Sequence, residues 1–198
     1  MKNTITKGLA ESISYDGYRS MVTTLLSENK STGHGQSEAL THYSRMNETR
    51  MNRLEKTVLI SEKNASAMQS LASRFTWLVI SEGWCGDAAQ ILPVLEKLAK
   101  LSDKVTLKIV LRDEHPELMD LFLTHNTRSI PKLIVLDENN AVKTTWGPRP
   151  KAALDLVADY KRENGVFDDA GKTALQLWYT KDKGASIQDE MVAIMAGL

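Results

Sequence analysis

The pattern of apolar and polar residues divides the chain into three zones. In the first, residues 1 to about 74, apolar residues recur at helical spacing, which predicts a short helix over 16–26, a long helix after Ser37 and another helix over 64–74. Ser37 is a good N-cap residue for the long helix. The apolar stripe that we expect this helix to bury comprises Leu40, Tyr43, Met51, Leu54 and Val58.

The second zone, roughly residues 75–163, alternates between strand and helix patterns. A nearly continuous apolar run over 75–80 predicts a strand that is buried on both faces. A helix over 85–101 should join it to the next strand in parallel, whereas a four-residue turn should make the last two strands antiparallel. The remaining expected elements are strands over 105–111, 133–136 and 141–146, a short helix over 116–123 and a helix that begins near Pro150.

The third zone, residues 164–198, predicts two short helices, over 172–180 and 186–195. No Pro- or Gly-rich linker separates the flanking zones from the middle one, and their apolar stripes need a surface to cover. We therefore expect an α/β fold with a mixed central sheet flanked by helices. Residues 1–74 and 164–198 should be helical extensions packed on the domain formed by residues 75–163.

The charges of the chain are balanced. Its 198 residues include 25 lysines and arginines and 25 aspartates and glutamates, so the net charge is zero. Nucleic-acid binding usually leaves a basic excess or patch. No window approaches the roughly 20 apolar residues of a membrane span, and the N-terminus lacks the apolar stretch of a signal peptide. We expect a cytoplasmic protein without nucleic-acid or membrane partners; its oligomeric state stays open.

Cys85 is the single cysteine. One cysteine cannot form an internal disulfide or a cysteine-rich zinc site. The histidines are dispersed, and none has metal-ligand spacing with another histidine or with Cys85. We therefore expect no metal site.

The segment from Ser81 to Gln90 carries the most informative chemistry. Cys85 follows an apolar strand and stands at the start of an amphipathic helix. Unpaired amides and the positive end of the helix dipole favour a thiolate there, and the thiolate is the attacking species in thiol chemistry. Gly86 would let the backbone pass close to a bound sulfur, and Trp84 could flank the thiol.

Trp-Cys-Gly after an apolar strand resembles the active site of the thioredoxin superfamily. Three further features agree in position. Pro93 lies where thioredoxins carry the proline that kinks the active-site helix, Pro131 lies in a segment that resembles their cis-proline segment, and Gly147 falls where they keep a glycine before the last helix. The resemblance covers about residues 75–163 and implies a thioredoxin-like fold. The helical extensions resemble a bacterial branch with a Trp-Cys-Gly-Asp motif.

Three positions depart from the thioredoxin pattern. Ala88 occupies the position of the second, resolving cysteine, and no other cysteine can replace it. Val79 stands where thioredoxin has a buried carboxylate that accepts a proton. Asp87 replaces the usual proline and would oppose a nearby thiolate, which raises the pKa of Cys85.

The resemblance implies thiol–disulfide exchange, and the missing second thiol limits it to a monothiol route. Cys85 would attack a protein or small-molecule disulfide, and glutathione or another low-molecular-weight thiol would regenerate it as a co-substrate rather than a bound cofactor. Pro131 and the backbone amide of Ile130 would align the substrate as an added strand. Trp84, Gly86, Asp87 and Ala88 would form the surroundings of the sulfur.

Two alternatives remain open. The fold could be redox-inactive and act as a binding or chaperone-like module through a groove near Trp84, Ile130 and Pro131. An exposed Cys85 could also link two copies of the chain through a disulfide.

Some charged residues have a plainer interpretation. Asp87 could act as an acid or base, but a helix-start carboxylate is the commoner explanation. Arg45, Arg50, Arg53 and Lys56 follow one another along the long N-terminal helix. Glutamates are interleaved with them, which favours a solvated helix face over an anion-binding surface.

Overall fold

The computed structural model describes residues 1–198 and contains one four-stranded mixed sheet. The strand order is β2-β1-β3-β4. The first two strands pair in parallel and the last two antiparallel, as the connections predict. The strands are β1 (Phe75–Ser81), β2 (Val105–Leu111), β3 (Lys132–Asp137) and β4 (Val142–Trp146).

Strand β1 is the centre of the core. Val79 pairs with Ile109 of β2 and with Leu133 of β3, so the strand has neighbours on both sides. Trp77 and Val79 have no solvent exposure, which is the burial that the continuous apolar run predicts. The chain that leaves the C-terminal end of β1 therefore starts from a rigid, fully paired element.

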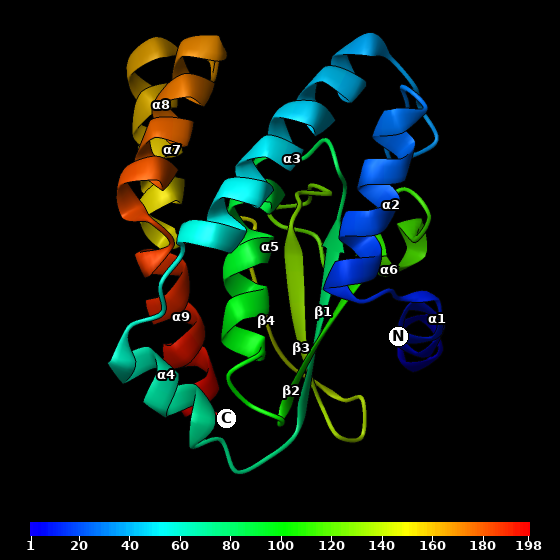
Figure 1. Ribbon diagram of the computed structural model, residues 1–198, viewed down its shortest axis with the longest axis vertical. Coiled ribbons are helices and arrows are strands. Elements are labelled where there is room, and N and C mark those ends of the chain that lie inside the picture. Colours follow the sequence, from blue (N-terminus) through cyan, green and yellow to red (C-terminus); the bar gives the residue numbers. More distant parts are fainter.

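Nine helices surround this sheet. Figure 1 shows α5 across the sheet, α3 over the upper end of α5, α7 to α9 along one side, and α1, α2 and α6 along the other. The helices are α1 (Lys2–Glu11), α2 (Tyr15–Ser27), α3 (Glu38–Thr57), α4 (Glu62–Gln69), α5 (Gly86–Ala99), α6 (Pro116–Asp120), α7 (Lys151–Asn164), α8 (Asp169–Asp182) and α9 (Ala185–Ala196).

The sequence pattern did not predict helix α1. This helix has no side-chain N-cap, no acidic residue in its first turn and no basic residue in its last turn, so the usual boundary signals are absent. By contrast, the Ser37 hydroxyl accepts a hydrogen bond from the Leu40 amide at 3.2 Å, which confirms the predicted start of α3.

The buried face of α3 differs from the expected apolar stripe. Met51 and Leu54 are buried as expected, but Tyr43 is 42% exposed. The buried face instead includes three polar residues, Thr41, Ser44 and Asn47. The helix is rotated toward these residues because it packs against a polar loop rather than a purely apolar surface, as the Asn47 side chain shows below.

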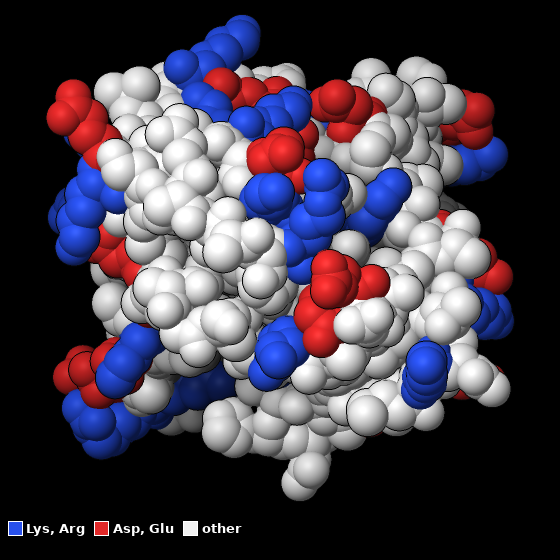
Figure 2. Space-filling view, turned by 90° about the horizontal axis from the view of Figure 1, so that it is seen from below, with Lys and Arg blue, Asp and Glu red and all other residues white.

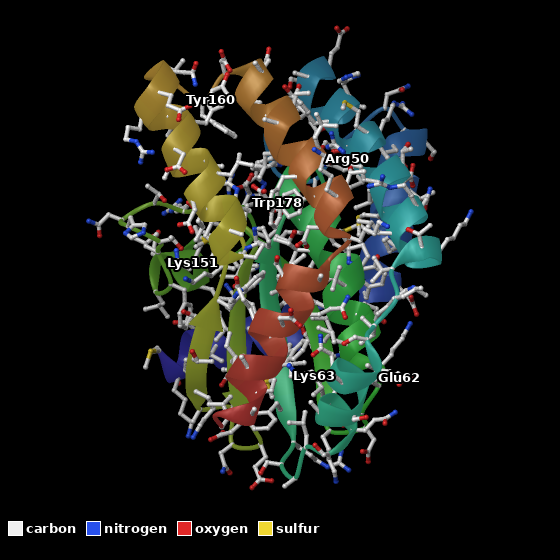
Figure 3. All side chains as sticks on the ribbon, turned by 90° about the vertical axis from the view of Figure 1, so that its left-hand side faces the viewer. Arg50, Glu62, Lys63, Lys151, Tyr160 and Trp178 are labelled. Atoms are coloured by element: carbon white, nitrogen blue, oxygen red, sulfur yellow. The ribbon has the colours of Figure 1, made fainter.

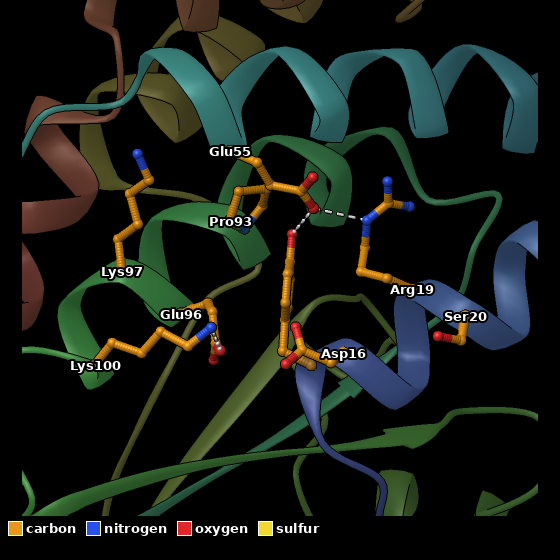
Figure 4. A pocket seen from close by; sticks show the side chains of 9 residues that line it. Asp16, Arg19, Ser20, Glu55, Pro93, Glu96, Lys97 and Lys100 are labelled. Carbon is orange, nitrogen blue, oxygen red and sulfur yellow. Dashed lines mark hydrogen bonds and ion pairs between the residues drawn. The ribbon is translucent and has the colours of Figure 1, made fainter.

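A half-buried ion pair joins α2 to α3. The Glu55 carboxylate accepts hydrogen bonds from the Tyr15 hydroxyl at 2.6 Å and from Arg19 Nε at 2.7 Å (Figure 4). Burial, and the Glu55 charge beside it, raise the pKa of Tyr15, which keeps the phenol protonated as a donor. A cavity of about 440 Å³ lies here, where α2, α3 and α5 meet, and no residue of the Cys85 loop lines it.

The C-terminal helix α9 contacts both the N-terminal helices and the sheet. Asn64 of α4 donates to Asp189 of α9 at 2.9 Å, and the Gln188 amide donates to the Leu59 carbonyl at 3.0 Å. On the sheet side, Trp77 Nε1 donates to the sulfur of Met195 at 3.3 Å. Both flanking zones therefore pack on the same core.

Charged residues of both signs are intermixed on the molecular surface seen in Figure 2. None of the helices is both long and apolar enough to cross a membrane.

Gly147 allows a close backbone approach beside Pro131. Its φ is +101°, and a Cβ atom at this position would lie 2.5 Å from the Pro131 carbonyl oxygen. Because the obstructing atom belongs to the backbone, it cannot move aside cheaply. The peptide bond between Ile130 and Pro131 is cis. Gly147 thus lets the end of β4 pack directly on the segment that carries Pro131.

We expect Gly147→Ala to destabilise the fold by about 3 kcal/mol, because it combines a disfavoured φ with a backbone clash. Urea unfolding would measure the free energy of unfolding. Gly35→Ala is the matched control, since a Cβ there meets nothing within 4 Å, and it should leave stability nearly unchanged. Equal stability of the two variants would contradict the close approach.

Candidate functional site

Cys85 is the N-cap residue of α5, directly after the turn that follows β1. Its sulfur accepts a hydrogen bond from the Ala88 amide at 3.4 Å. The thiol in turn donates to the carbonyl oxygen of Ile130, also at 3.4 Å. The residue is only 7% exposed. The sulfur therefore lies between the start of α5 and the Ile130–Pro131 segment, held by one contact to each.

The environment of Cys85 favours the neutral thiol. Burial raises its pKa to about 12, and the Asp87 carboxylate contributes in the same direction. Backbone hydrogen bonds from Ala88 and Asp87, and the charge of Arg149, lower the pKa but do not outweigh burial. The amides at the helix start therefore favour the thiolate, as expected, but burial outweighs them, and the expected opposition by Asp87 is also present.

Asp87 forms a buried, two-pronged ion pair. Arg149 Nε and Nη2 approach the two carboxylate oxygens at 2.9 and 2.7 Å. The Tyr179 hydroxyl donates to Oδ1 at 2.9 Å. Burial, followed by the Asp87 charge, raises the pKa of Tyr179, so this phenol stays a donor. Asp87 is a first-turn carboxylate of α5 that also joins the β4–α7 connection to α8.

The two small residues of the motif are covered by other helices. A Cβ at Gly86 would lie 3.4 Å from the Gln176 amide nitrogen of α8 and 3.7 Å from Arg50 Nη1 of α3. Ala88, at the position of the absent second cysteine, is 1% exposed. Both extensions therefore close over the start of α5.

The other residues that the sequence predicts for the site, Trp84, Ile130 and Pro131, also lie near Cys85. Trp84 is partly buried, and the guanidinium carbon of Arg112 lies 4.7 Å from its ring centroid, which is a cation–π contact. Ile130 and Pro131 are both buried beside the sulfur. Because both residues are buried, an extended substrate chain could pair with this segment only after the segment becomes exposed.

Sequence reasoning missed Glu82, a fully buried carboxylate three residues before Cys85. Its Oε1 accepts a hydrogen bond from the Asp113 amide at 3.0 Å, and its other oxygen accepts one from the Thr32 hydroxyl. Burial raises the pKa of Glu82. The available signal was a glutamate directly after the largely apolar strand β1, whereas the thioredoxin pattern places its carboxylate at position 79, which is a valine here.

The turn before Cys85 is held by residues from the N-terminal extension. Thr32 Oγ1 accepts a hydrogen bond from the Gly83 amide at 2.7 Å. Asn47 of α3 donates to the Gly83 carbonyl at 2.9 Å. Tyr18 of α2 is 1% exposed, and burial raises its pKa, with negative charge on Cys85 or Glu82 adding to the shift. These contacts fix the turn that leads into Cys85.

A pocket of about 390 Å³ opens next to the Cys85 loop, between α3 and α8. Trp84, Gly86 and Asp87 form one wall of it. Arg50, expected on a solvated face, also lines this pocket, whereas Arg53 on the same helix is exposed. Figure 3 shows Arg50 where α3 passes α8. No group of three or more His, Cys, Asp or Glu side chains is placed to hold a metal ion.

Comparisons with known proteins agree with this geometry. A family model described as Thioredoxin matches residues 33–161, well over half of the chain. The thioredoxin of Bacillus subtilis is 38% identical over 72 residues, which is 36% of this chain and 66% of that protein. The thioredoxin of Listeria monocytogenes is 38% identical over 76 residues, 37% of this chain and 70% of that protein. The chain thus spans just under two thirds of the first of these relatives.

One solved structure has a similar fold over nearly the whole chain. A protein of unknown function from Pseudomonas aeruginosa superimposes with a TM-score of 0.62 at 19% sequence identity. The match covers 93% of this chain and 98% of that one, so it includes the helical extensions as well as the sheet. At this identity the likeness concerns the fold alone.

Removing the charge of Asp87 and removing the charge of Arg149 should shift the pKa of Cys85 in opposite directions. Asp87→Asn removes an anion that raises this pKa, so the pKa should fall; Arg149→Met removes a cation that lowers it, so the pKa should rise. Iodoacetamide alkylation rates measured against pH would give both values. Each variant breaks a buried pair and should lose about 3 kcal/mol of stability, so alkylation is measured where both remain folded. Shifts of the same sign would contradict this electrostatic account.

The raised pKa of Glu82 predicts a pH-dependent contribution to stability. The folded state holds this proton more tightly than the unfolded state, so the stabilisation is present at low pH and is lost as pH rises through the folded-state pKa. Relative to Glu82→Gln, the wild type should therefore lose free energy of unfolding as pH rises above the ordinary pKa of a glutamate. Urea unfolding of both proteins checks this. A difference that does not change with pH would show that Glu82 has an ordinary pKa.

Proposed function

The chain belongs to the thioredoxin family, and from this premise we propose that it carries out thiol–disulfide exchange through Cys85. The observation that supports the proposal is the position of the sulfur. It stands at the N-cap of α5, after the central strand, and faces the Ile130 carbonyl beside Pro131. A substrate sulfur that replaced this internal contact would meet the amides at the start of the helix.

The exchange would run in two balanced steps. The Cys85 thiol first loses its proton to solvent, and the thiolate attacks one sulfur of a disulfide; a mixed disulfide forms and the other sulfur leaves as a thiolate. An external thiolate then attacks this mixed disulfide, which produces a new disulfide and restores the Cys85 thiolate. The buried methyl group of Ala88 cannot perform this second step. The route is therefore of the monothiol type.

The substrates that fit this route are protein or small-molecule mixed disulfides, with glutathione or another low-molecular-weight thiol as the resolving reagent. Such a route depends on a pool of reduced thiols, which supports a cytoplasmic location. We place the chain in a bacterial branch of the family that combines the Trp-Cys-Gly-Asp motif with the absence of a second cysteine.

Burial sets the rate of this reaction in the resting structure. Because burial raises the pKa of the Cys85 thiol to about 12, very little of the sulfur is ionised at neutral pH. The rate of exchange should therefore be low at neutral pH and rise steeply toward alkaline pH. It should also increase when Cys85 becomes exposed to solvent.

The burial of Cys85 also favours a second candidate function. A thiol that is 7% exposed and neutral fits a redox-inactive binding module that uses the surface around Trp84 and Pro131. The two candidates differ in whether the folded protein exchanges its thiol at all.

We expect the wild-type protein to take up one hydroxyethylthio group from 2-hydroxyethyl disulfide at mildly alkaline pH, and to release it when reduced glutathione is added. Intact-mass spectrometry measures both steps. Cys85→Ser, a nearly isosteric control, should take up none. Reduction of an insulin-type disulfide without added thiol should be weak.

The contrary result is a Cys85 that reacts only after urea unfolds the chain. That outcome would reject exchange and support the binding module. Because circular dichroism reports folding in the same samples, loss of structure cannot be mistaken for loss of chemistry.

A further inference from the structure

The pocket between α3 and α8 carries an excess of positive charge. Three cationic side chains line it, Arg50, Arg149 and Lys172, against one carboxylate, Asp87. Asp87 is already engaged on both oxygens by Arg149. Arg50 is therefore left without a carboxylate at ion-pair distance, and Lys172 pairs only with the exposed Asp169.

Arg50 differs from the other half-buried or buried arginines of the fold. Arg19 pairs with Glu55, and Arg149 pairs with Asp87. Arg50 has no carboxylate within ion-pair distance; its Nη1 donates to the neutral Asn47 side chain at 2.7 Å. Burial lowers the pKa of Arg50, and the neighbouring Arg53 contributes in the same direction. A half-buried guanidinium without a counter-ion is costly, and a bound anion would relieve that cost.

The guanidinium of Arg50 lies close to the start of α5. It would be 3.7 Å from a Cβ at Gly86, the residue that follows Cys85. Because Gly86 has no side chain, the Arg50 guanidinium can lie close to the first turn of the helix. Lys172 pairs only with Asp169, in an exposed contact that is worth little in water and can turn toward a ligand.

Apart from Gln176, the rest of the pocket lining is largely apolar. Leu40 and Tyr43, expected in the core of α3 but not buried there, line it together with Phe167 and Leu175. A volume of about 390 Å³ lies within the usual range for small-molecule sites. The pocket therefore suits a small organic anion with an apolar body.

We propose that this pocket binds the carboxylate of a small organic thiol or disulfide, with Arg50 as its counter-ion, and so selects acidic substrates for Cys85. The inference rests on the proposed function, because it identifies the substrate class of the same site. Arg50 is then a specificity-determining residue that touches the substrate at its acidic end. A guanidinium can form two parallel hydrogen bonds with one carboxylate, which a lysine cannot.

Three symmetric disulfides that differ in their end groups test the charge preference. They are 3,3′-dithiodipropionate, with carboxylates, 2-hydroxyethyl disulfide, with hydroxyls, and cystamine, with ammonium groups. Each reacts with Cys85 by forming one mixed disulfide and releasing one thiolate. Intact-mass spectrometry at low ionic strength gives the rate constants, and we expect the order dithiodipropionate, hydroxyethyl disulfide, cystamine.

Arg50→Gln should lower the preference for dithiodipropionate over hydroxyethyl disulfide by about tenfold. Because the comparison is a ratio within one variant, any change in the Cys85 pKa cancels. Arg53→Gln removes a charge from the exposed face of the same helix and should leave the ratio unchanged. Arg50→Lys keeps the charge and should retain part of the preference. Equal ratios in the Gln variants at positions 50 and 53 would overturn the inference.

A non-covalent measurement separates this inference from the proposed exchange. In Cys85→Ser, which cannot react, calorimetry should detect binding of dithiodipropionate. The double variant with Cys85→Ser and Arg50→Gln should not bind it. Such binding supports the proposal that the pocket binds acidic ligands. If Cys85 of the wild type is inert as well, only the proposed thiol–disulfide exchange is rejected. If no binding is detected and all three disulfides react at equal rates, the proposal that the pocket selects acidic substrates is overturned. The proposed exchange at Cys85 would still hold.

Discussion

The buried carboxylate of Asp87 is the interaction on which the arrangement of the site depends. It belongs to the first turn of α5, yet its partners, Arg149 and Tyr179, come from the β4–α7 connection and from α8. A carboxylate that is 8% exposed needs such partners, since an unpaired buried charge is very unfavourable. The C-terminal extension is therefore bound to the beginning of α5 by an electrostatic requirement as well as by apolar packing.

The same anion opposes the chemistry that the position of Cys85 favours. A helix start would stabilise a thiolate, but Asp87 and burial favour the neutral thiol. Asp87 thus stabilises the folded structure through its buried partners, and the same side chain lowers the reactivity of the sulfur by raising the pKa of Cys85. Movement of α8 would break the hydrogen bond from Tyr179 to Asp87 and uncover Gly86, the residue that follows Cys85.

The fold could be predicted from the sequence because its signals are local. The apolar run of β1 and the capping Ser37 define their elements without knowledge of distant residues. The candidate site was only partly predictable: Cys85 and Pro131 stand out by motif, but Glu82 and Arg50 do not. Their roles depend on partners far along the chain, such as Thr32 for Glu82, or on a pocket that exists only when α3 lies against α8. No periodicity in one segment encodes such a partnership.

The double role of the Thr32 hydroxyl bears on the autonomy of the sheet domain. This one hydroxyl satisfies both the buried Glu82 carboxylate and the Gly83 amide, and both groups belong to the turn that leads into Cys85. Without Thr32, one oxygen of the Glu82 carboxylate and the Gly83 amide would lose these hydrogen bonds, whereas the Asp113 amide would still bind the other carboxylate oxygen. The N-terminal extension therefore supplies hydrogen bonds that complete the turn before Cys85, in addition to the apolar surface that it covers.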